Sequence, residues 1–317
     1  MSSDLYLLHR IAHKYYLEGL SQQQISVQEN ISRPHVSRLL AKAKEIGIVR
    51  IDVSLPDQYY MSNLASQICE KLNLEAVEIT ELLPGDDTVI GRIPRSIARL
   101  AATSLDQHIR KAKTVGIGWG KTVYQTSLEL RNVEAHPDMT IIPLVGMSDE
   151  TNSYQQNNVI VNRFAERYKA KSYYTSVPAL YDSQVKRHQL EEDRYERLKQ
   201  WWNRLDVAVI GLGPRFKRGE FLLKEASDPY KRFISDSAVV GDILASFFYA
   251  DGSILQSNAY YEIVALPLSK LKEIKKVICL AGGEEKVPGI VAAGLSGFFS
   301  TLFTDLGTAE RILKYEI

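Results

Sequence analysis

The stretch TVGIGWGKT, Thr114 to Thr122, decides the fold. An apolar run, Thr114–Ile117, leads into glycines and then into a helix-compatible segment, 123–130, so the sequence predicts a strand, a tight turn and a helix. The first N–H groups of such a helix and its positive dipole end favour a bound anion. A strand-to-helix turn without any ligand is the alternative interpretation, and the rest of the chain has to decide between them.

The spacing excludes two nucleotide-binding loops. A P-loop needs four residues between its first glycine and the Gly-Lys-Ser/Thr triplet, whereas Gly116 and Gly120 are separated by three. The dinucleotide pattern G-x-G-x-x-G fails as well, because Gly116, Gly118 and Gly120 do not have its offsets. What is left is a general anion-binding turn.

Apolar runs alternate with helical segments through most of the chain, which predicts an α/β fold with a parallel sheet covered on both faces. The expected strands are Ala76–Thr80, Thr114–Ile117, Met139–Leu144, Val207–Ile210, Val277–Ala281 and Thr301–Phe303. The expected helices are 61–72, 89–106, 123–130, 157–169, 184–204, 287–295 and 306–314.

Length and charge narrow the classes of function. A chain of 317 residues allows two domains. Its net charge of +1 gives no overall attraction to nucleic acid or membranes, and no apolar run approaches the ~20 residues of a membrane span. Two distant cysteines, Cys69 and Cys279, indicate a reducing compartment, so we expect a cytoplasmic protein. We expect no cofactor and no metal site.

The first fifty residues have a different pattern. A helical stripe covers 5–18, and Ser21 with Gln24 forms a capping-box sequence that opens a second helix. Asn30 suits a tight turn, and Ser32 can cap a third helix. Two short helices joined by a tight turn are typical of a helix-turn-helix.

The third helix is apolar behind and basic in front. Val36 and Leu40 share its inner face, and the stretch from Arg33 to Arg50 carries five Lys/Arg against one acid, a local excess of four. Such a patch neutralises DNA phosphates, although a merely solvated basic face is the plainer interpretation. The expected DNA-binding residues are Ser32, Arg33, His35, Ser37, Arg38 and Lys42.

Alternation from Ile48 to Val53 predicts a strand that forms a wing beside this helix. Pro56 and the polar residues after it read as a linker. The sequence therefore predicts a DNA-binding domain over 1–56 and an effector and oligomerisation domain over 57–317.

LSQQQISVQENISRPHVSRLLAKAKEIGIVRIDV, Leu20 to Val53, resembles the N-terminal domain of the SorC family of bacterial sugar-binding transcriptional regulators, to which the deoxyribonucleoside and central glycolytic regulators are related. The resemblance continues through GIGWGKT, IIPLVG, DVAVIGLGP, AVVGDILASFFYADG and CLAGGEEKVPG. One departure is Glu29, which stands where such sequences carry an apolar residue, and we expect Val27 to take over its packing. The resemblance implies a winged-helix-like head and a Rossmann-like effector domain of the sugar-phosphate isomerase/deaminase type.

Polar, glycine-rich turns follow several of the expected strands, with 240–242 expected to lie at or near a helix beside them. Since ligands of parallel sheets bind beyond the carboxyl ends of the strands, we expect one pocket there. Lysines and backbone amides suit a phosphate, while an aspartate and amides suit hydroxyls, so the expected effector is a phosphorylated sugar or polyol. The expected effector-binding residues are Gly118, Gly120, Lys121, Thr122, Gly146, Asn157, Asp242, Gly282, Gly283 and Lys286.

The isomerase-like fold makes a sugar-phosphate isomerase or deaminase the alternative function. No close pair of carboxylates and no Glu–His couple stands out in the rim loops, so we expect no catalytic residues. The resemblance implies that some deoxyribose-phosphate-responsive members form an imine through a lysine where this chain has Val145, which disfavours that effector here. We expect a homodimer or homotetramer whose paired heads bind double-stranded operator DNA.

Overall fold

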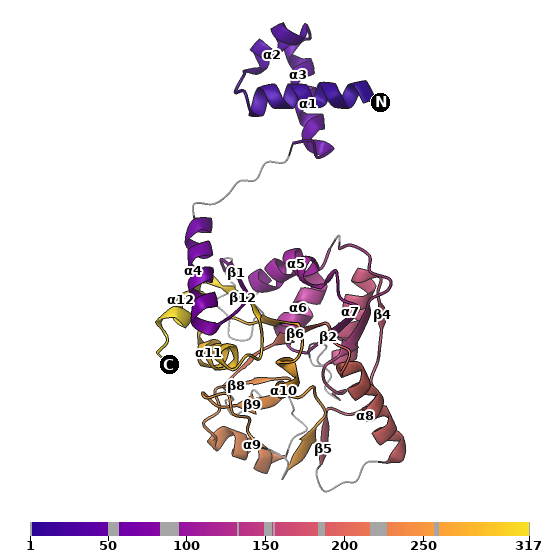
Figure 1. Ribbon diagram of the computed structural model, residues 1–317, viewed down its shortest axis with the longest axis vertical. Helices are drawn as coiled ribbons and strands as arrows, with labels where there is room; N and C mark the ends of the chain where they lie inside the picture. Colours follow the sequence, from indigo (N-terminus) through magenta and orange to yellow (C-terminus); the bar gives the residue numbers. More distant parts are fainter. Residues whose placement is uncertain are drawn as a thin grey trace. The chain divides into compact units, whose positions relative to one another are not determined.

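The computed structural model describes residues 2–49, 57–82, 95–131, 133–148, 154, 156–182, 188–215, 227–256 and 260–316. The chain forms two compact units, Met1–Gln58 and Tyr59–Ile317. This division falls two residues after the boundary expected from the sequence. Figure 1 labels the helices and strands of both units.

The first unit consists of α1 (Ser2–Tyr16), α2 (Gln22–Glu29) and α3 (Arg33–Glu45). Two serines begin α2 and α3 as predicted. The Ser21 side chain accepts from the Gln24 amide in a capping box, and the Ser32 side chain accepts from the His35 amide. Asn30 closes α2 with a φ of 52°, the left-handed conformation that Asn tolerates. The core of this unit is made by Leu8, Ile11, Ala12, Ile25, Val36, Leu40 and Ala43.

Glu29 is held by charge. It accepts from Arg10 Nη2 at 2.8 Å and from Lys14 Nζ at 2.7 Å, so it ties α2 to α1. The expectation for Val27 was wrong, because its side chain is 73% exposed. The predicted wing strand lies mostly outside the described residues, and its described part, 48–49, is a bend.

The second unit is built on a seven-stranded parallel sheet in the order β1-β12-β11-β6-β2-β3-β4, which confirms the predicted α/β class. The predicted strands agree with the observed ones to within two residues. The strands are β1 (Ala76–Thr80), β2 (Thr114–Ile117), β3 (Thr140–Pro143), β4 (Lys171–Ser172), β6 (Val207–Gly211), β11 (Lys276–Leu280) and β12 (Thr301–Asp305).

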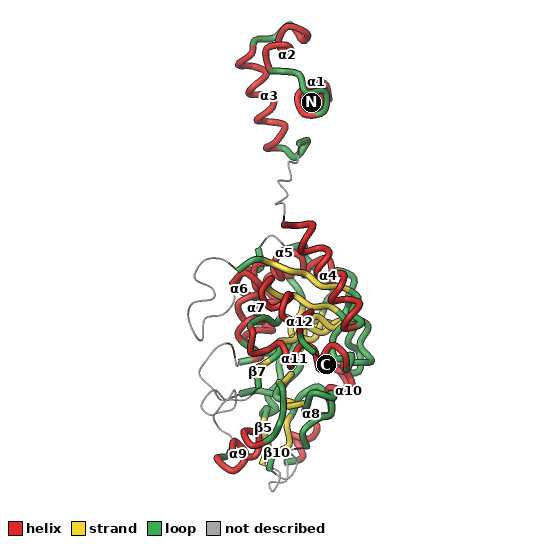
Figure 2. Tube along the Cα trace, turned by 90° about the vertical axis from the view of Figure 1, so that its left-hand side faces the viewer, coloured by secondary structure: helices red, strands yellow, loops and turns green. Residues whose placement is uncertain are grey.

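Helices cover both faces of the sheet. One layer, α5 to α7, packs on one face, and α4, α11 and α12 lie on the other side (Figure 2). Their apolar stripes supply much of a single continuous core. The helices are α4 (Asp57–Leu72), α5 (Arg95–Ile109), α6 (Lys121–Glu129), α7 (Asn157–Tyr168), α8 (Gln189–Trp202), α9 (Asp228–Asp236), α10 (Leu268–Leu271), η1 (Glu284–Lys286), α11 (Val287–Leu295) and α12 (Leu306–Lys314).

Two small antiparallel sheets were not predicted. One pairs β5 (Leu180–Asp182) with β10 (Tyr261–Ile263), and the other has the order β7 (Gly213–Pro214), β8 (Gly241–Ile243), β9 (Ser246–Phe248). The segment 240–242 does not open a helix, because Gly241 and Asp242 belong to β8, but it lies near one as expected, since β8 packs against α11. These strands are too short to show a period-2 pattern in the sequence.

Candidate functional site

The strand order reverses direction between β2 and β6. From β2 the chain continues to β3 and β4 on one side, and from β6 it continues to β11 and β12 on the other. The crevice at such a switch point, beyond the carboxyl ends of the strands, is where open α/β sheets bind ligands. The loops that follow β2, β6 and β11 therefore surround the candidate site.

The loop after β2 is the stretch with which the sequence analysis began. The Gly118 amide donates to the Val209 carbonyl at 2.8 Å, which ties the loop to β6. Gly120 has a φ of 113°, which favours glycine, and begins α6 with no side-chain cap. The first-turn N–H groups of α6, including those of Lys121 and Thr122, thus have no intrahelical partner and face the crevice end of the strand. Lys121 also lies over the ring of Tyr154, 5.6 Å from its centroid.

Asp242 lies beside the loop after β6. It pairs with Gly213 across β7 and β8, and a Cβ on Gly213 would overlap the Asp242 carboxylate. Only glycine leaves room for that carboxylate. Burial raises the pKa of Asp242 to about 6, although the Ala245 amide and the charge of Lys286 lower it.

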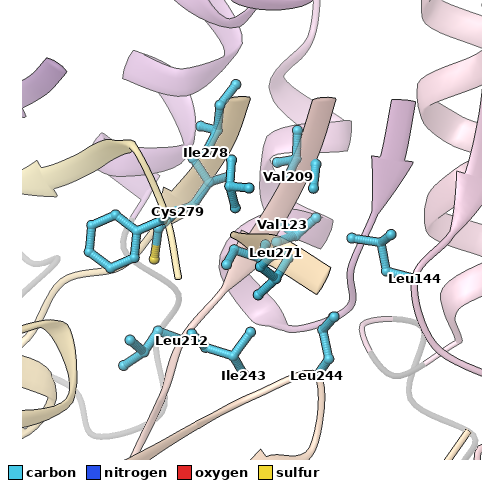
Figure 3. Close-up of a cluster of buried hydrophobic side chains, with 14 of the residues drawn as sticks. Val123, Leu144, Val209, Leu212, Ile243, Leu244, Leu271, Ile278 and Cys279 are labelled. Carbon is cyan, nitrogen blue, oxygen red and sulfur yellow. The ribbon is translucent and has the colours of Figure 1, made fainter. Parts of the chain in front are cut away.

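The β8–β9 turn carries an uncommon backbone. Leu244 and Ala245 have φ values of 52° and 63°, in the left-handed region that residues with a side chain seldom adopt. Leu244 is buried and lies so close to Gly118 that a Cβ there would come within 2.9 Å of its Cδ2. Figure 3 shows Leu244 and Ile243 near Leu212 in the apolar cluster beneath the site. The β8–β9 turn thus packs against the loop after β2, which contains Gly118.

Lys286 ends η1, the turn after β11. Burial lowers its pKa, and Lys121 lowers it further, while Glu285, Cys279 and Asp242 act in the opposite direction. Lys286 therefore interacts electrostatically with both Lys121 and Asp242, and a shared role of the three side chains in ligand binding stays a prediction.

Gly282 and Gly283 are placed by a buried network. Asp305 accepts from the Thr308 hydroxyl at 2.6 Å, and that hydroxyl accepts from the Gly283 amide at 2.7 Å. A Cβ on Gly282 would overlap Asp305, and Gly283 has a φ of 113°. Sequence reasoning missed this support, because Asp305 is the last residue of β12, about twenty residues later in the chain.

Asn157 is the first residue of α7 and is 1% exposed. Its Nδ2 donates to the Val145 carbonyl at 3.3 Å, whereas its Oδ1 has no hydrogen-bond partner among the described residues. A buried polar atom without a partner is rare in folded proteins and needs one. The chain just before it touches the β2 loop, since the Gly120 amide donates to the Tyr154 carbonyl at 2.9 Å. Asn157 thus offers an unused acceptor three residues after Tyr154, which contacts the loop after β2.

Gly146 has a different environment. Its amide donates to the Val264 carbonyl at 2.7 Å, and a Cβ there would come within 2.6 Å of the Pro178 carbonyl oxygen. Close backbone packing accounts for this glycine, and a direct ligand contact stays a prediction. Val145 next to it is fully buried.

In the first unit, α3 presents one polar face. All six residues expected to bind DNA are exposed, while Val36, Leu40 and Ala43 are buried behind them. A basic, exposed helix preceded by a tight turn can enter a DNA major groove. The exposed residues are Ser32, Arg33, His35, Ser37, Arg38 and Lys42.

The family model described as "Putative sugar-binding domain" matches residues 57–314. The chain belongs to this family. No described helix has the length and apolar character that a membrane crossing requires.

Two named transcriptional regulators are similar to this chain over nearly their whole length. The chain is 27% identical over 322 residues to the sorbitol operon regulator of Klebsiella pneumoniae, and the aligned region covers 99% of each chain. It is 29% identical over 305 residues to the deoxyribonucleoside regulator of Bacillus subtilis, which covers 96% of each.

Solved structures agree with this fold. The crystal structure of the full-length sorbitol operon regulator SorC from Klebsiella pneumoniae covers 98% of this chain and 99% of its own, with a TM-score of 0.70 and 24% identity. A DeoR family transcriptional regulator from Listeria monocytogenes covers 79% of this chain and 98% of its own, with a TM-score of 0.66 and 27% identity. The resemblance to the SorC family inferred from the sequence is confirmed.

Proposed function

We propose that this protein is a transcriptional regulator of a carbohydrate-utilisation operon that binds operator DNA and is controlled by a phosphorylated sugar or polyol. The observation that carries the proposal is the electrostatic interaction of Lys286 with both Lys121 and Asp242, which come from segments around the switch point of the sheet. Whole-length similarity to regulators supports the link to transcription.

The site suits both ends of such a ligand. Two ammonium groups and the open amides of α6 complement a phosphate. Asp242 and the free Oδ1 of Asn157 are acceptors for hydroxyl groups. These acceptors would allow the site to distinguish a phosphorylated sugar from inorganic phosphate.

The first unit is a helix-turn-helix in this proposal, and α3 is its recognition helix. Arg38 has the donor geometry for guanine, while Lys42 neutralises phosphate. The effector domains form a homodimer or homotetramer, so that paired heads meet two half-sites about one DNA turn apart or multiples of it. The protein acts in the cytoplasm, where its operator lies.

The ligand controls DNA binding by its differential affinity for two states of the protein. A coupling of about 1–3 kcal/mol changes operator affinity about 5- to 150-fold. We expect no turnover of the ligand, because the charged groups that act on Lys286 in the described residues are Glu285, Cys279, Asp242 and Lys121, with no histidine among them to serve as a general base.

The full-length protein tests the proposal directly. A thermal-shift screen of phosphorylated and unphosphorylated sugars should show stabilisation by phosphorylated ones only. DNA binding to the promoter beside the gene should fall steeply with salt and change when the stabilising sugar is added. If the protein fails to bind duplex DNA at low salt, with and without every stabilising sugar, the proposed role as a DNA-binding regulator is wrong. If a sugar is converted to a product, the isomerase alternative is favoured.

A further inference from the structure

A second cluster of polar side chains lies at the opposite edge of the sheet. Asp106 projects from α5, and Glu134 and His136 come from the segment that leads into β3. One ligand atom from each lies within 4.8 Å of the other two. Because β3 begins at Thr140, just after this segment, the cluster is at the amino ends of the strands, away from the candidate effector site.

Two of these atoms form a hydrogen bond whose length is close to the separation of two metal ligands. His136 Nε2 and Asp106 Oδ1 are 3.2 Å apart, and two ligands about 2.0–2.1 Å from a tetrahedral zinc ion are about 3.3–3.4 Å apart. The backbone of His136 is fixed, since its amide donates to the Tyr168 carbonyl at 2.7 Å and its carbonyl accepts from the Met139 amide at 3.0 Å. These backbone hydrogen bonds and the contact of Nε2 with Asp106 hold the imidazole in place without the metal.

An independent observation points to a missing partner. Tyr168, at the end of α7, is fully buried, and its hydroxyl has no hydrogen-bond partner among the described residues. Its ring lies 5.9 Å from the His136 ring, and its backbone carbonyl accepts from the His136 amide. Buried hydroxyls almost always have a partner, and a water molecule on an ion held by the cluster would supply one.

We propose that Asp106, Glu134 and His136 bind one Zn²⁺ ion, with a water molecule beside Tyr168 as the fourth ligand. One imidazole and two carboxylates suit zinc, whereas Mg²⁺ and Ca²⁺ prefer all-oxygen sets. The ion fastens the segment before β3 to α5 and to the end of α7. Its role is structural, because the site is at the edge opposite the crevice and has no part in the proposed sensing of sugars.

Sequence spacing could not show this site. His136 and Asp106 are 30 positions apart and come from different elements, so no short ligand motif exists. Only the packing of α5 against the segment before β3 brings them together.

The test uses full-length protein that has been stripped with a chelator and titrated with ZnCl₂ by calorimetry. The wild type should bind one zinc more tightly than any other class of site, and its thermal midpoint should rise with added zinc. Glu134→Gln and Asp106→Asn, which keep the side-chain size, should each lose that binding and the rise in midpoint. Asp138→Asn changes an exposed carboxylate of the same segment that is outside the cluster, and should behave like the wild type.

The proposal is overturned if the wild type takes up no zinc, or if Glu134→Gln binds it as the wild type does. MgCl₂ should cause no rise in midpoint, and an equal rise with Mg²⁺ would also overturn it. Circular dichroism of the stripped variants shows that they are folded, so that lost binding is not confused with unfolding.

Discussion

Helices begin in two different ways in the two units. In the first unit, Ser21 and Ser32 each cap a helix by accepting an amide hydrogen bond. At the crevice edge of the second, α6, α7 and η1 begin at Gly120, Gln156 and Gly283 with no hydrogen bond from a capping side chain.

The difference does not come from the sheet edge itself. At the same edge, α12 begins on Asp305, whose side chain accepts from the Thr308 amide. At this edge, a side-chain cap is thus present at the start of α12 and absent at the starts of α6, α7 and η1. Capping stabilises a helix by satisfying its first N–H groups, whereas uncapped starts leave those groups to a ligand. The comparison indicates that the capping serines stabilise their helices, whereas the glycines leave N–H groups open for a ligand.

The largest effect, a loss of affinity for the sugar phosphate, should come from a change at the candidate site. Lys286→Met removes one of the two ammonium groups of the candidate site and should weaken the sugar phosphate found by the thermal screen about 10- to 100-fold, since a charge-assisted hydrogen bond contributes about 1.5–3 kcal/mol. Calorimetry of full-length protein measures this.

Lys270→Met is the matched control, because Lys270 pairs with Glu273 on the surface. It should bind the sugar like the wild type, and both variants should bind DNA normally without ligand. Unchanged affinity in Lys286→Met would remove this residue from the site.

On the capped side, α3 allows a comparison within one helix. Arg38→Ala should lower the preference for the operator by about 1–3 kcal/mol at one base pair, whereas Lys42→Ala should weaken all DNA alike and flatten the salt slope by about one. Fluorescence anisotropy on operator and scrambled duplexes at several salt concentrations separates the two. Equal loss of specificity in both variants would contradict the assignment.

Asp242 should make the stability of the folded protein depend on pH. Its folded-state pKa, about 6, is above the ordinary 3.8, so the stability it contributes is fully present below pH 3.8 and is lost as the pH rises through 6. Between pH 5 and pH 8 this loss should be about 1.4 kcal/mol. Asp242→Asn should remove that part of the pH dependence in urea unfolding.

Asp251→Asn is the control for this experiment. The hydroxyl and amide of Ser253 lower the pKa of Asp251, so it titrates below the range tested. Its variant should keep the wild-type slope between pH 5 and pH 8. A slope that is also unchanged in Asp242→Asn would show that the carboxylate is not buried in solution.

Much of this architecture could be predicted, because its parts depend on local rules. Apolar runs such as Val207–Ile210 marked strands to within two residues, and the reversal of strand order explains why loops distant in sequence gather at one edge. Ser21 and Ser32 marked helix starts because capping needs only residues three positions apart.

The parts that could not be predicted depend on long-range packing. Leu244 and Ala245 form a turn whose dihedral angles normally call for Gly or Asn, and burial against Gly118 overrides that preference. Glu29 stands at an apolar position because Arg10 and Lys14 reach it from another helix. The unpaired Oδ1 of Asn157 could not be predicted either, because the position of this side chain is set by the hydrogen bond of its Nδ2 to the distant Val145 carbonyl.

The smallest expected effect tests the capped side directly. Ser32→Ala removes the oxygen that accepts from the His35 amide and should destabilise α3 by about 1 kcal/mol. Hydrogen exchange of 33–45 in the full-length protein should quicken about fivefold, while exchange around α6 stays unchanged. Ser37→Ala is the control, since this exposed serine is inside the helix and caps nothing. If both variants exchange alike, the Ser32 cap contributes no stability, and the contrast between capped and open helix starts loses its energetic basis.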